Sequence, residues 1–301
     1  METFLQQLVN GLTIGSMYAL VALGYTMVYG VMRLINFAHG DLVAFSAFVG
    51  LAVYSKIVHG GAAITWGGVI IVFAATVLIV AIVGVTLERV AYRPLRSAPR
   101  LSAVVSALGA SLVIQNGIML LWGPRPLIFP GDLFPATTWE IGGVMISFVQ
   151  VLILGLSFLL MVALYLFVEK TRIGTAIRAS SIDQDTARLM GINVNSIILT
   201  IFIIGSALGA IGGLFIALYY RGISFNMGWN YGLAAFIAAI IGGIGNIPGA
   251  MLGGMLLGLF NAFIAGYVSS TWADAYTFIL LIAILIVRPT GILGERVAEK
   301  V

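Results

Sequence analysis

The stretch TRIGTAIRASSIDQDTARLMGINVN, Thr171 to Asn195, is polar and charged and lies between two long apolar runs. Ser181, followed by Gln184, has the pattern of a helix N-cap with a capping box. Acids follow Ser181 in what would be the first helical turn, where the helix dipole favours them. Gly191 suits the C′ position that ends a helix. The pattern predicts a helix of about nine residues, which would serve as a docking surface or simply be an ordinary helical surface loop.

Apolar runs extend through the whole chain of 301 residues, which is 61% hydrophobic and only 9% charged. A soluble domain carries about 25% charged residues. Asp, Glu, Lys and Arg are absent from the long segments 3–32, 57–87, 101–124, 141–168, 189–220 and 222–273. A spanning helix needs about 20 apolar residues, so each segment has room for at least one span. These features predict a single all-α domain over residues 1–301, a polytopic transmembrane helical bundle with broken or re-entrant helices.

The apolar segments and the loops between them predict eight or nine passes. We expect spans at about residues 5–31, 42–58, 66–87, 101–122, 143–168, 196–219, 249–268 and 272–287, with a short or re-entrant segment at 231–246. Arginines gather in the loop 88–100, where Pro94 makes a continuous helix unfavourable, and in the stretch 169–194. Because Lys and Arg favour the cytoplasmic side, we expect these loops and the tail Glu295–Val301 in the cytoplasm, and the loop 123–142 outside.

Several chemistries lack the residues that they need. No lysine follows a glycine, so the chain has no P-loop for ATP. Cysteine is absent, and the two histidines have no metal-ligand spacing. The net charge of +4 indicates no nucleic-acid partner, and acids confined to the ends of apolar runs weigh against a proton-driven carrier. We therefore expect no catalytic residues, no metal and no cofactor in this chain.

Two glycine-bearing breaks, Ile35–Gly40 and Gly242–Gly249, interrupt the apolar runs. In transporters, interrupted helices in corresponding parts of two halves point to the substrate path. Alternatively, the glycines serve helix packing or a bend, which we favour for the second break, and a lone buried histidine is more often packed than ligating. The candidate path-lining residues are Asn36, His39, Gln115 and Asn116.

Four motifs, in order along the chain, carry a family resemblance. They are INFAHG at 35–40, ERVAYRP at 88–94, GGIGNIPGA at 242–250 and RPTGILG at 288–294. Together they resemble the LivH-type permease of bacterial branched-chain amino-acid ABC importers over essentially the whole chain. The resemblance implies a permease of the plasma (inner) membrane for branched-chain or other apolar amino acids. It also implies partners: a second related permease that completes the pore, two cytosolic ATPase subunits that bind ATP, and a periplasmic substrate-binding protein.

In that family, the region 171–195 is the cytoplasmic coupling loop, whose short helix docks in a cleft of the ATPase. Many permeases begin it with Glu-Ala-Ala, whereas this chain has Arg-Ala-Ser-Ser at 178–181, so individual ATPase contacts do not carry over. The coupling candidates are Arg178, Ser181, Asp183, Asp185, Arg188 and Gly191. Two alternatives stay open: the same machine importing urea or short amides, which similar permeases carry, and an ATP-independent channel or carrier.

Overall fold

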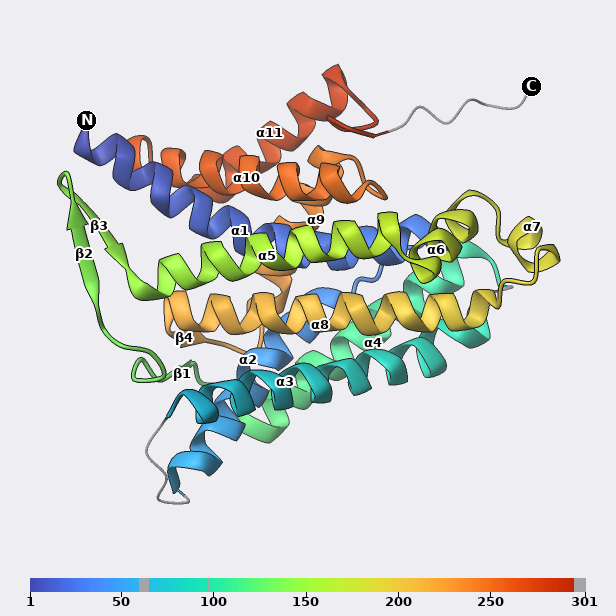
Figure 1. Cartoon of the computed structure of the whole chain (residues 1–301), viewed down its shortest axis with the longest axis horizontal. Coiled ribbons are helices and arrows are strands. Elements are labelled where there is room, and N and C mark those ends of the chain that lie inside the picture. Colours follow the sequence, from blue (N-terminus) through green and yellow to red (C-terminus); the bar gives the residue numbers. More distant parts are fainter. Residues whose placement is uncertain (60–64, 97, 295–301) are drawn as a thin grey trace.

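A computed structural model describes residues 1–59, 65–96 and 98–294, and the predicted cytoplasmic tail 295–301 lies outside them. The longer helices of the described chain are α1 (Glu2–Met32), α2 (His39–His59), α3 (Trp66–Leu87), α4 (Arg100–Trp122), α5 (Phe148–Lys170), α8 (Val194–Tyr220), α9 (Met227–Gly242), α10 (Ile247–Tyr267) and α11 (Ala273–Val287) (Figure 1). Strands β1 (Leu127–Ile128) and β4 (Gly222–Ile223) form one small antiparallel sheet, and β2 (Thr138–Ile141) and β3 (Val144–Ser147) form another. The predicted helical architecture is confirmed, with these two small sheets as additions.

The helix lengths confirm a polytopic membrane protein. Within the described residues, 7 helices are long and apolar enough to cross a membrane: α1, α2, α3 with its extension, α4, α5, α8 and α10. The shorter apolar helices α9 and α11 have 16 and 15 residues, which gives lengths of about 24 and 22 Å. The hydrocarbon core of a bilayer is about 30 Å thick, so both are shorter than a full span. α9 corresponds to the short segment expected at 231–246 but begins and ends four residues earlier, and α11 corresponds to the span expected at 272–287.

Two other predicted boundaries were also wrong. The span expected from residue 143 begins at Phe148, because Val144–Ser147 pairs with β2 as a strand. The loop expected over 88–100 is helical as far as Leu95, through the π turn η1 (Glu88–Tyr92) and the 3₁₀ turn η2 (Arg93–Leu95). Pro94 stands in the first turn of η2, a position at which a helix tolerates proline.

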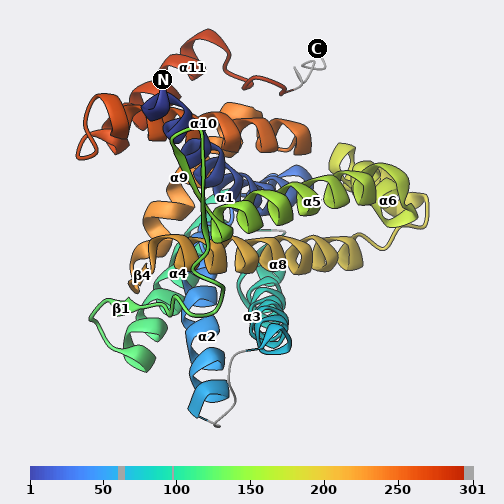
Figure 2. The same cartoon turned by 60° about the vertical axis from the view of Figure 1, so that its left-hand side comes forward.

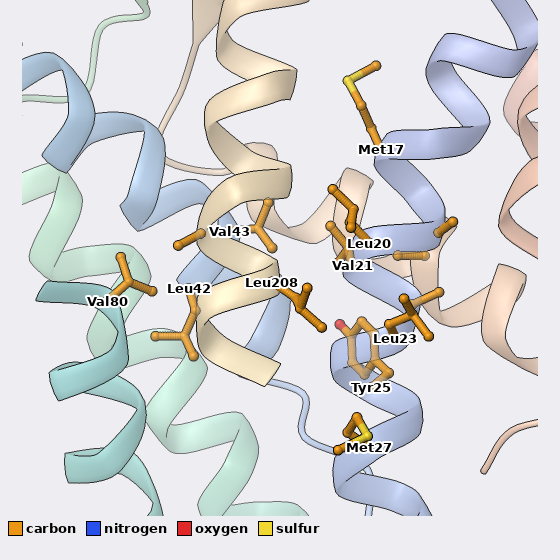
Figure 3. Packing of buried hydrophobic residues seen from close by; sticks show 14 of the residues in the cluster. Met17, Leu20, Val21, Leu23, Tyr25, Met27, Leu42, Val43, Val80 and Leu208 are labelled. Carbon is orange, nitrogen blue, oxygen red and sulfur yellow. The ribbon is translucent and has the colours of Figure 1, made fainter. Parts of the chain in front are cut away.

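The core of the bundle forms around α1 and α8. The most apolar part of α1 is 89% buried and that of α8 is 78% buried, whereas α4 is only 11% buried and therefore lies at the periphery. Figure 3 shows Leu20, Val21 and Leu23 of α1 together with Leu208 of α8 in this core. In both overall views, α10 and α11 lie on one side of α1, and α2, α3 and α4 lie on the other (Figures 1 and 2).

Glycines let α1 and α10 approach closely, and Gly11 and Gly15 have the four-residue spacing of small residues that is typical of such helix crossings. A Cβ added at Gly15 would press on the backbone of Met255, and one added at Gly258 would collide with the backbone of Gly15. The crossing therefore depends on the absence of side chains on both helices.

The bundle has two distinct ends (Figure 1). We call the end with the N-terminus and both sheets the sheet end, and the end with the 171–195 segment the loop end. In the described chain, Lys and Arg at the sheet end are Lys56, Arg125 and Arg221. At the loop end they are Arg33, Arg89, Arg93, Arg96, Arg100, Lys170, Arg172, Arg178, Arg188 and Arg288. The basic residues are thus strongly biased to the loop end.

Candidate functional site

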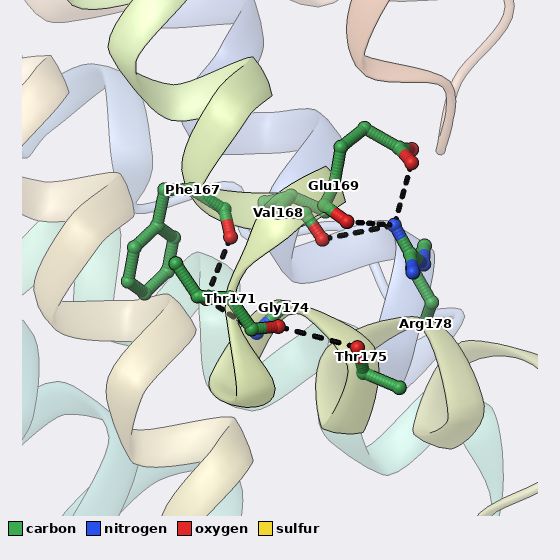
Figure 4. A network of polar contacts seen from close by, with 7 residues as sticks. All are labelled: Phe167, Val168, Glu169, Thr171, Gly174, Thr175 and Arg178. Atoms are coloured by element: carbon green, nitrogen blue, oxygen red, sulfur yellow. Dashed lines mark hydrogen bonds and ion pairs between the residues drawn. The ribbon is translucent and has the colours of Figure 1, made fainter.

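The 171–195 segment folds into two short helices, α6 (Arg172–Ile182) and α7 (Gln184–Leu189). Thr171 forms the corner between α5 and α6: its hydroxyl donates to the Phe167 carbonyl at 2.6 Å and accepts the Gly174 N–H at 3.0 Å (Figure 4). This side-chain cap satisfies a free donor at the start of α6. The segment is therefore a folded projection fixed to the end of α5.

Arg178 strengthens that corner. Its guanidinium donates to the carbonyls of Val168 and Glu169, both at 3.1 Å, and to the Glu169 carboxylate at 2.6 Å (Figure 4). These contacts satisfy carbonyl groups that the end of α5 leaves without helical partners. Within this chain, Arg178 thus holds α6 against α5, and its predicted contact with an ATPase remains a prediction.

The predicted N-cap of the short helix was wrong in its residue. Ser181 lies inside α6, where its hydroxyl donates to the Arg178 carbonyl at 2.7 Å. Asp183 caps α7 instead, accepting the N–H groups of Asp185 at 2.9 Å and Thr186 at 3.3 Å. Asp and Ser are about equally good N-caps, so the choice depends on where α6 ends. The predicted capping box of Ser181 and Gln184 does not form, and the side chain of Gln184 donates to the Val31 carbonyl of α1 instead.

Gly191 is the predicted C′ stop. It has φ of +83°, in the left-handed region that glycine adopts without strain. Its N–H bonds to the Arg188 carbonyl at 3.0 Å, and the N–H of Ile192 bonds to the Ala187 carbonyl at 3.0 Å. This is the paired hydrogen bonding of a Schellman motif, so the predicted helix end is confirmed.

The charged side chains of α7 are turned to solvent. Arg188 and Asp185 form an ion pair at 2.7 Å, with side chains 53% and 86% exposed. Exposed pairs of this kind contribute little to stability, typically about 0.2–1 kcal/mol. Both charges are therefore accessible to a partner.

Three exposed apolar side chains were missed by the sequence reasoning. Ile182, Leu189 and Met190 are 86%, 87% and 79% exposed at the tip of the segment. Large apolar side chains that a polar projection leaves exposed are candidates for contact with a partner. Their position in the sequence could have indicated this exposure. They lie at the ends of the two short helices, where no periodic apolar pattern assigns them to a core.

The segment is also tied to the rest of the loop end. Gln184 Nε2 donates to the Val31 carbonyl of α1 at 2.7 Å, and Arg33 Nη2 donates to the Ser181 carbonyl at 3.1 Å. Arg96 forms an ion pair with Glu88 of η1 and donates to the Asn195 amide oxygen at 2.6 Å. Burial lowers the pKa of the Arg96 guanidinium, and the Glu88 carboxylate opposes that shift.

The first break carries Asn36 and His39, which are 2% and 1% exposed. Asn36 Oδ1 accepts the Tyr92 hydroxyl at 2.9 Å. His39 Nε2 lies 3.2 Å from the Val21 carbonyl, and its ring meets that of Tyr25 edge-on at 4.7 Å. Since Val21 lies midway along α1, the break runs from the loop end back into the bundle. Both residues are packed and bonded within this chain.

The other two path candidates lie on α4. Gln115 is partly buried, whereas Asn116 is exposed on the outer face of the helix. Asn116 Nδ2 donates to the Leu112 carbonyl one turn earlier at 2.8 Å. The four candidates therefore occupy two different environments, one inside the bundle and one on a peripheral helix.

The second break packs against the last of the four motifs. Gly243 and Gly245 have φ of +108° and +97°. Asn246 caps α10 by accepting the Gly249 N–H at 2.8 Å, and its amide donates to the Leu293 carbonyl at 3.0 Å. A Cβ at Gly242 would collide with the backbone of Gly249. These contacts support a packing role for the second break.

A cavity of about 470 Å³ lies beside the 171–195 segment. It is bounded by the end of α1, the α5–α6 corner and the second break, with Arg33, Arg178 and Asn246 in its lining. The cavity separates α6 from the start of α10, so the segment contacts the bundle chiefly through α1, α5 and α8.

Comparisons with known proteins assign the family. The pattern of the family described as "Branched-chain amino acid transport system / permease component" matches residues 7–287. The chain is 43% identical over 302 residues to the high-affinity branched-chain amino acid transport system permease protein BraD of Pseudomonas aeruginosa, covering 99% of this chain and 98% of that protein. It is 41% identical over 303 residues to the corresponding LivH protein of Escherichia coli, with the same two coverages of 99% and 98%. A probable LivH protein of Methanocaldococcus jannaschii is 29% identical over 201 residues, which are 64% of this chain and 56% of that protein. The chain is therefore a member of the permease-component family of branched-chain amino acid transport systems.

Proposed function

We propose that this chain is the transmembrane permease subunit of an ATP-driven ABC importer for branched-chain, apolar amino acids. The observation that carries the proposal is the identity of 43% and 41%, over nearly full length, to two permeases named for that transport. The chain is a transport protein and not an enzyme. It would form half of a pore in the bacterial inner membrane, with a second, related permease as the other half.

The energy would come from other subunits. The sequence has no P-loop lysine, so ATP would be bound and hydrolysed by two cytosolic ATPase subunits. The bias of Lys and Arg to the loop end supports a cytoplasmic position for that end. The sheet end would then receive substrate from a periplasmic binding protein. The chain itself would bind no cofactor.

The 171–195 segment would act as the coupling loop that meets the ATPase. Asp183 and Gly191 would define the two ends of α7, and Arg178 would hold α6 to α5. The contacts with the ATPase itself would come from the tip of the segment. Its anchor residues would be Ile182, Leu189 and Met190, with Ser181, Asp185 and Arg188 around them. Exposed apolar anchors surrounded by polar groups are the usual arrangement of an interface hot spot.

The substrate path would involve the first break and α4. Asn116 supports this, because an exposed amide on an apolar helix is costly against lipid and is stabilised where it faces protein or water. Gln115 lies next to it on α4. Asn36 and His39 are internal in the single chain, so they would reach the path through movement of the break or by shaping it.

The two alternatives are less well supported. The curated relatives that align with nearly the whole chain are named as branched-chain amino acid permeases, rather than as carriers of urea or short amides. An ATP-independent channel would have no use for a capped, exposed projection with apolar anchors.

The proposal can be tested by purifying the tagged chain from its source membrane and identifying the proteins that accompany it. We expect a related permease and an ATPase in the complex, and a periplasmic protein encoded with them that binds leucine, isoleucine or valine. Recovery of the chain alone or only with copies of itself, together with ATP-independent uptake, would contradict the proposal. A neighbouring binding protein specific for urea would support the same machine with the other substrate.

A further inference from the structure

The loop end contains a closed series of polar contacts that joins the coupling loop to the first break. One side of the series is direct. Gln184 and Ser181, at the junction of α6 and α7, bond to Val31 and Arg33 at the end of α1, with distances of 2.7 and 3.1 Å. The first break follows immediately, so this side attaches the coupling loop to the start of the break.

The other side passes through Arg96. Its guanidinium donates to Asn195, at the end of the coupling loop, at 2.6 Å and forms an ion pair with Glu88. The Glu88 side chain is only 3% exposed and that of Arg96 is 18% exposed. A buried carboxylate needs its partner, because a charge left unpaired away from water is strongly unfavourable. Arg96 therefore ties the coupling loop firmly to η1.

The π turn η1 carries the contact onward. It begins at Glu88 and ends at Tyr92, so a single turn holds the ion pair at one end and the tyrosine at the other. The carbonyl of Ala91 accepts the Ser106 hydroxyl of α4 at 2.8 Å. Single π turns within α-helices are rare and are frequently found at functional sites. This one interrupts the long helix at the level where the coupling loop meets it.

Tyr92 completes the series at the first break. Its hydroxyl donates to Asn36 Oδ1 at 2.9 Å, and its ring lies 5.3 Å from that of Phe202 on α8. Tyr92 is 1% exposed and Asn36 is 2% exposed, so no water competes for the bond. The hydroxyl is the only polar group of Tyr92, whereas the ring supplies the packing.

We propose that Glu88, Tyr92 and Arg96 are positioning residues that transmit displacement of the coupling loop to the break at Asn36. The inference rests on the proposed function and goes beyond it by naming the route. The two sides of the series hold the break at two points, Arg33 and Asn36, so a shift of the coupling loop turns the break between them. Energetic coupling between distant sites is carried by packed and hydrogen-bonded elements that have two discrete arrangements. Here that element would be η1, which would change between a π turn and a regular α-helical turn.

The test uses the assembled importer with its ATPases and binding protein in proteoliposomes. Tyr92→Phe removes only the hydroxyl and keeps the ring against Phe202. We expect normal assembly, ATP hydrolysis close to that of the unaltered complex, and about a fivefold fall in substrate imported per ATP hydrolysed. That factor corresponds to one net hydrogen bond of about 1 kcal/mol. The matched control is Tyr165→Phe, an exposed tyrosine of α5, for which we expect no change.

Arg96 gives a second, independent measurement. Arg96→Gln should uncouple hydrolysis from uptake, and Arg96→Lys, which keeps the charge beside Glu88, should restore most of the ratio. A double variant, Asn36→Leu with Tyr92→Phe, should lose no more than the worse single variant, because both changes break the same bond.

The possible outcomes distinguish failure of this inference from failure of the proposed function. An unchanged uptake ratio for Tyr92→Phe, or a fall only in the amount of assembled complex, would overturn the inference. Additive losses in the double variant would also overturn it. If the unaltered complex showed no ATP-dependent uptake at all, the proposed function would fail first.

Discussion

The exposed apolar tip of the 171–195 segment, the proposed coupling loop, gives the sharpest single perturbation. Leu189 and Met190 are 87% and 79% exposed, so replacing both with serine removes almost no packing from the chain itself. Surface substitutions of this kind change the free energy of unfolding by no more than about 0.5 kcal/mol. In a complex, full burial of one such side chain contributes about 1.5–3 kcal/mol. If the ATPase buries only Leu189 of the two, the double serine variant should bind the ATPase about 10- to 100-fold more weakly than the unaltered permease does.

The assay is titration of the isolated ATPase subunit onto the permease complex in nanodiscs, with the fraction bound measured at each concentration. Ile128 in β1 is 82% exposed at the sheet end, so Ile128→Ser is a matched control that should bind ATPase normally. Thermal unfolding of the purified complexes should be the same for all variants. An unchanged ATPase affinity for the Leu189→Ser, Met190→Ser double variant would refute the assignment of this tip as the contact.

Three further predictions concern the shape of the coupling loop, the α1–α10 crossing and the topology. Gly191→Val should destabilise the end of α7 by about 1–2 kcal/mol, the cost of a left-handed residue with a Cβ. Protease should then cleave within α7 faster, while the membrane spans stay protected. An unaltered cleavage rate would contradict the role given to Gly191, whose φ is +83°. Gly258→Ala should lower the thermal stability by about 1–3 kcal/mol through overpacking against the α1 backbone, whereas Gly155→Ala, whose added Cβ meets nothing within 4 Å, should be neutral or stabilising. Because the chain has no cysteine, an impermeant thiol reagent added to spheroplasts should label Thr137→Cys and not Arg188→Cys, and the reverse pattern would invert the orientation.

The span positions were readable from the sequence because a bilayer imposes a length. The uncharged runs 57–87 and 101–124 contain the spans expected at 66–87 and 101–122, which match α3 and α4 closely, since a charged residue inside a span is costly. The helix of α3 nevertheless continues through η1 and η2 to Leu95. The same rule misplaced the start of α5. Residues Val144–Ser147 are mainly apolar, but they pair with β2, and an apolar run of four residues does not distinguish a strand from a helix.

The details of the coupling loop were harder to predict, because they depend on contacts between distant segments. Ser181 and Asp183 are both good N-caps, and the choice between them follows from the length of α6. Gln184 was expected to complete a capping box, but it bonds to Val31, 153 positions away in sequence. By contrast, the Gly191 stop is a local feature of the backbone and was predictable.

The polar partners of the first break were equally inaccessible. Asn36 and Tyr92 belong to two of the motifs that carried the family resemblance, yet their hydrogen bond joins residues 56 positions apart. Sequence alone marked Asn36 as a candidate lining residue, and the structure adds that it is buried and bonded. The ion pair between Glu88 and Arg96 was also unforeseen, since the region was expected to be an irregular loop. Because Arg96 also donates to Asn195, it belongs to the same set of polar contacts as the 171–195 segment.

The most direct test of the account is uptake of labelled leucine by proteoliposomes that contain this chain, its permease partner, the ATPases and the binding protein. We expect uptake from the side of the binding protein that requires ATP on the loop-end side. We also expect it to stop when the ATPases cannot hydrolyse ATP, and to be reduced by unlabelled isoleucine or valine but not by urea. Uptake that continues without ATP hydrolysis would contradict the central claim that this chain is the permease of an ATP-driven importer.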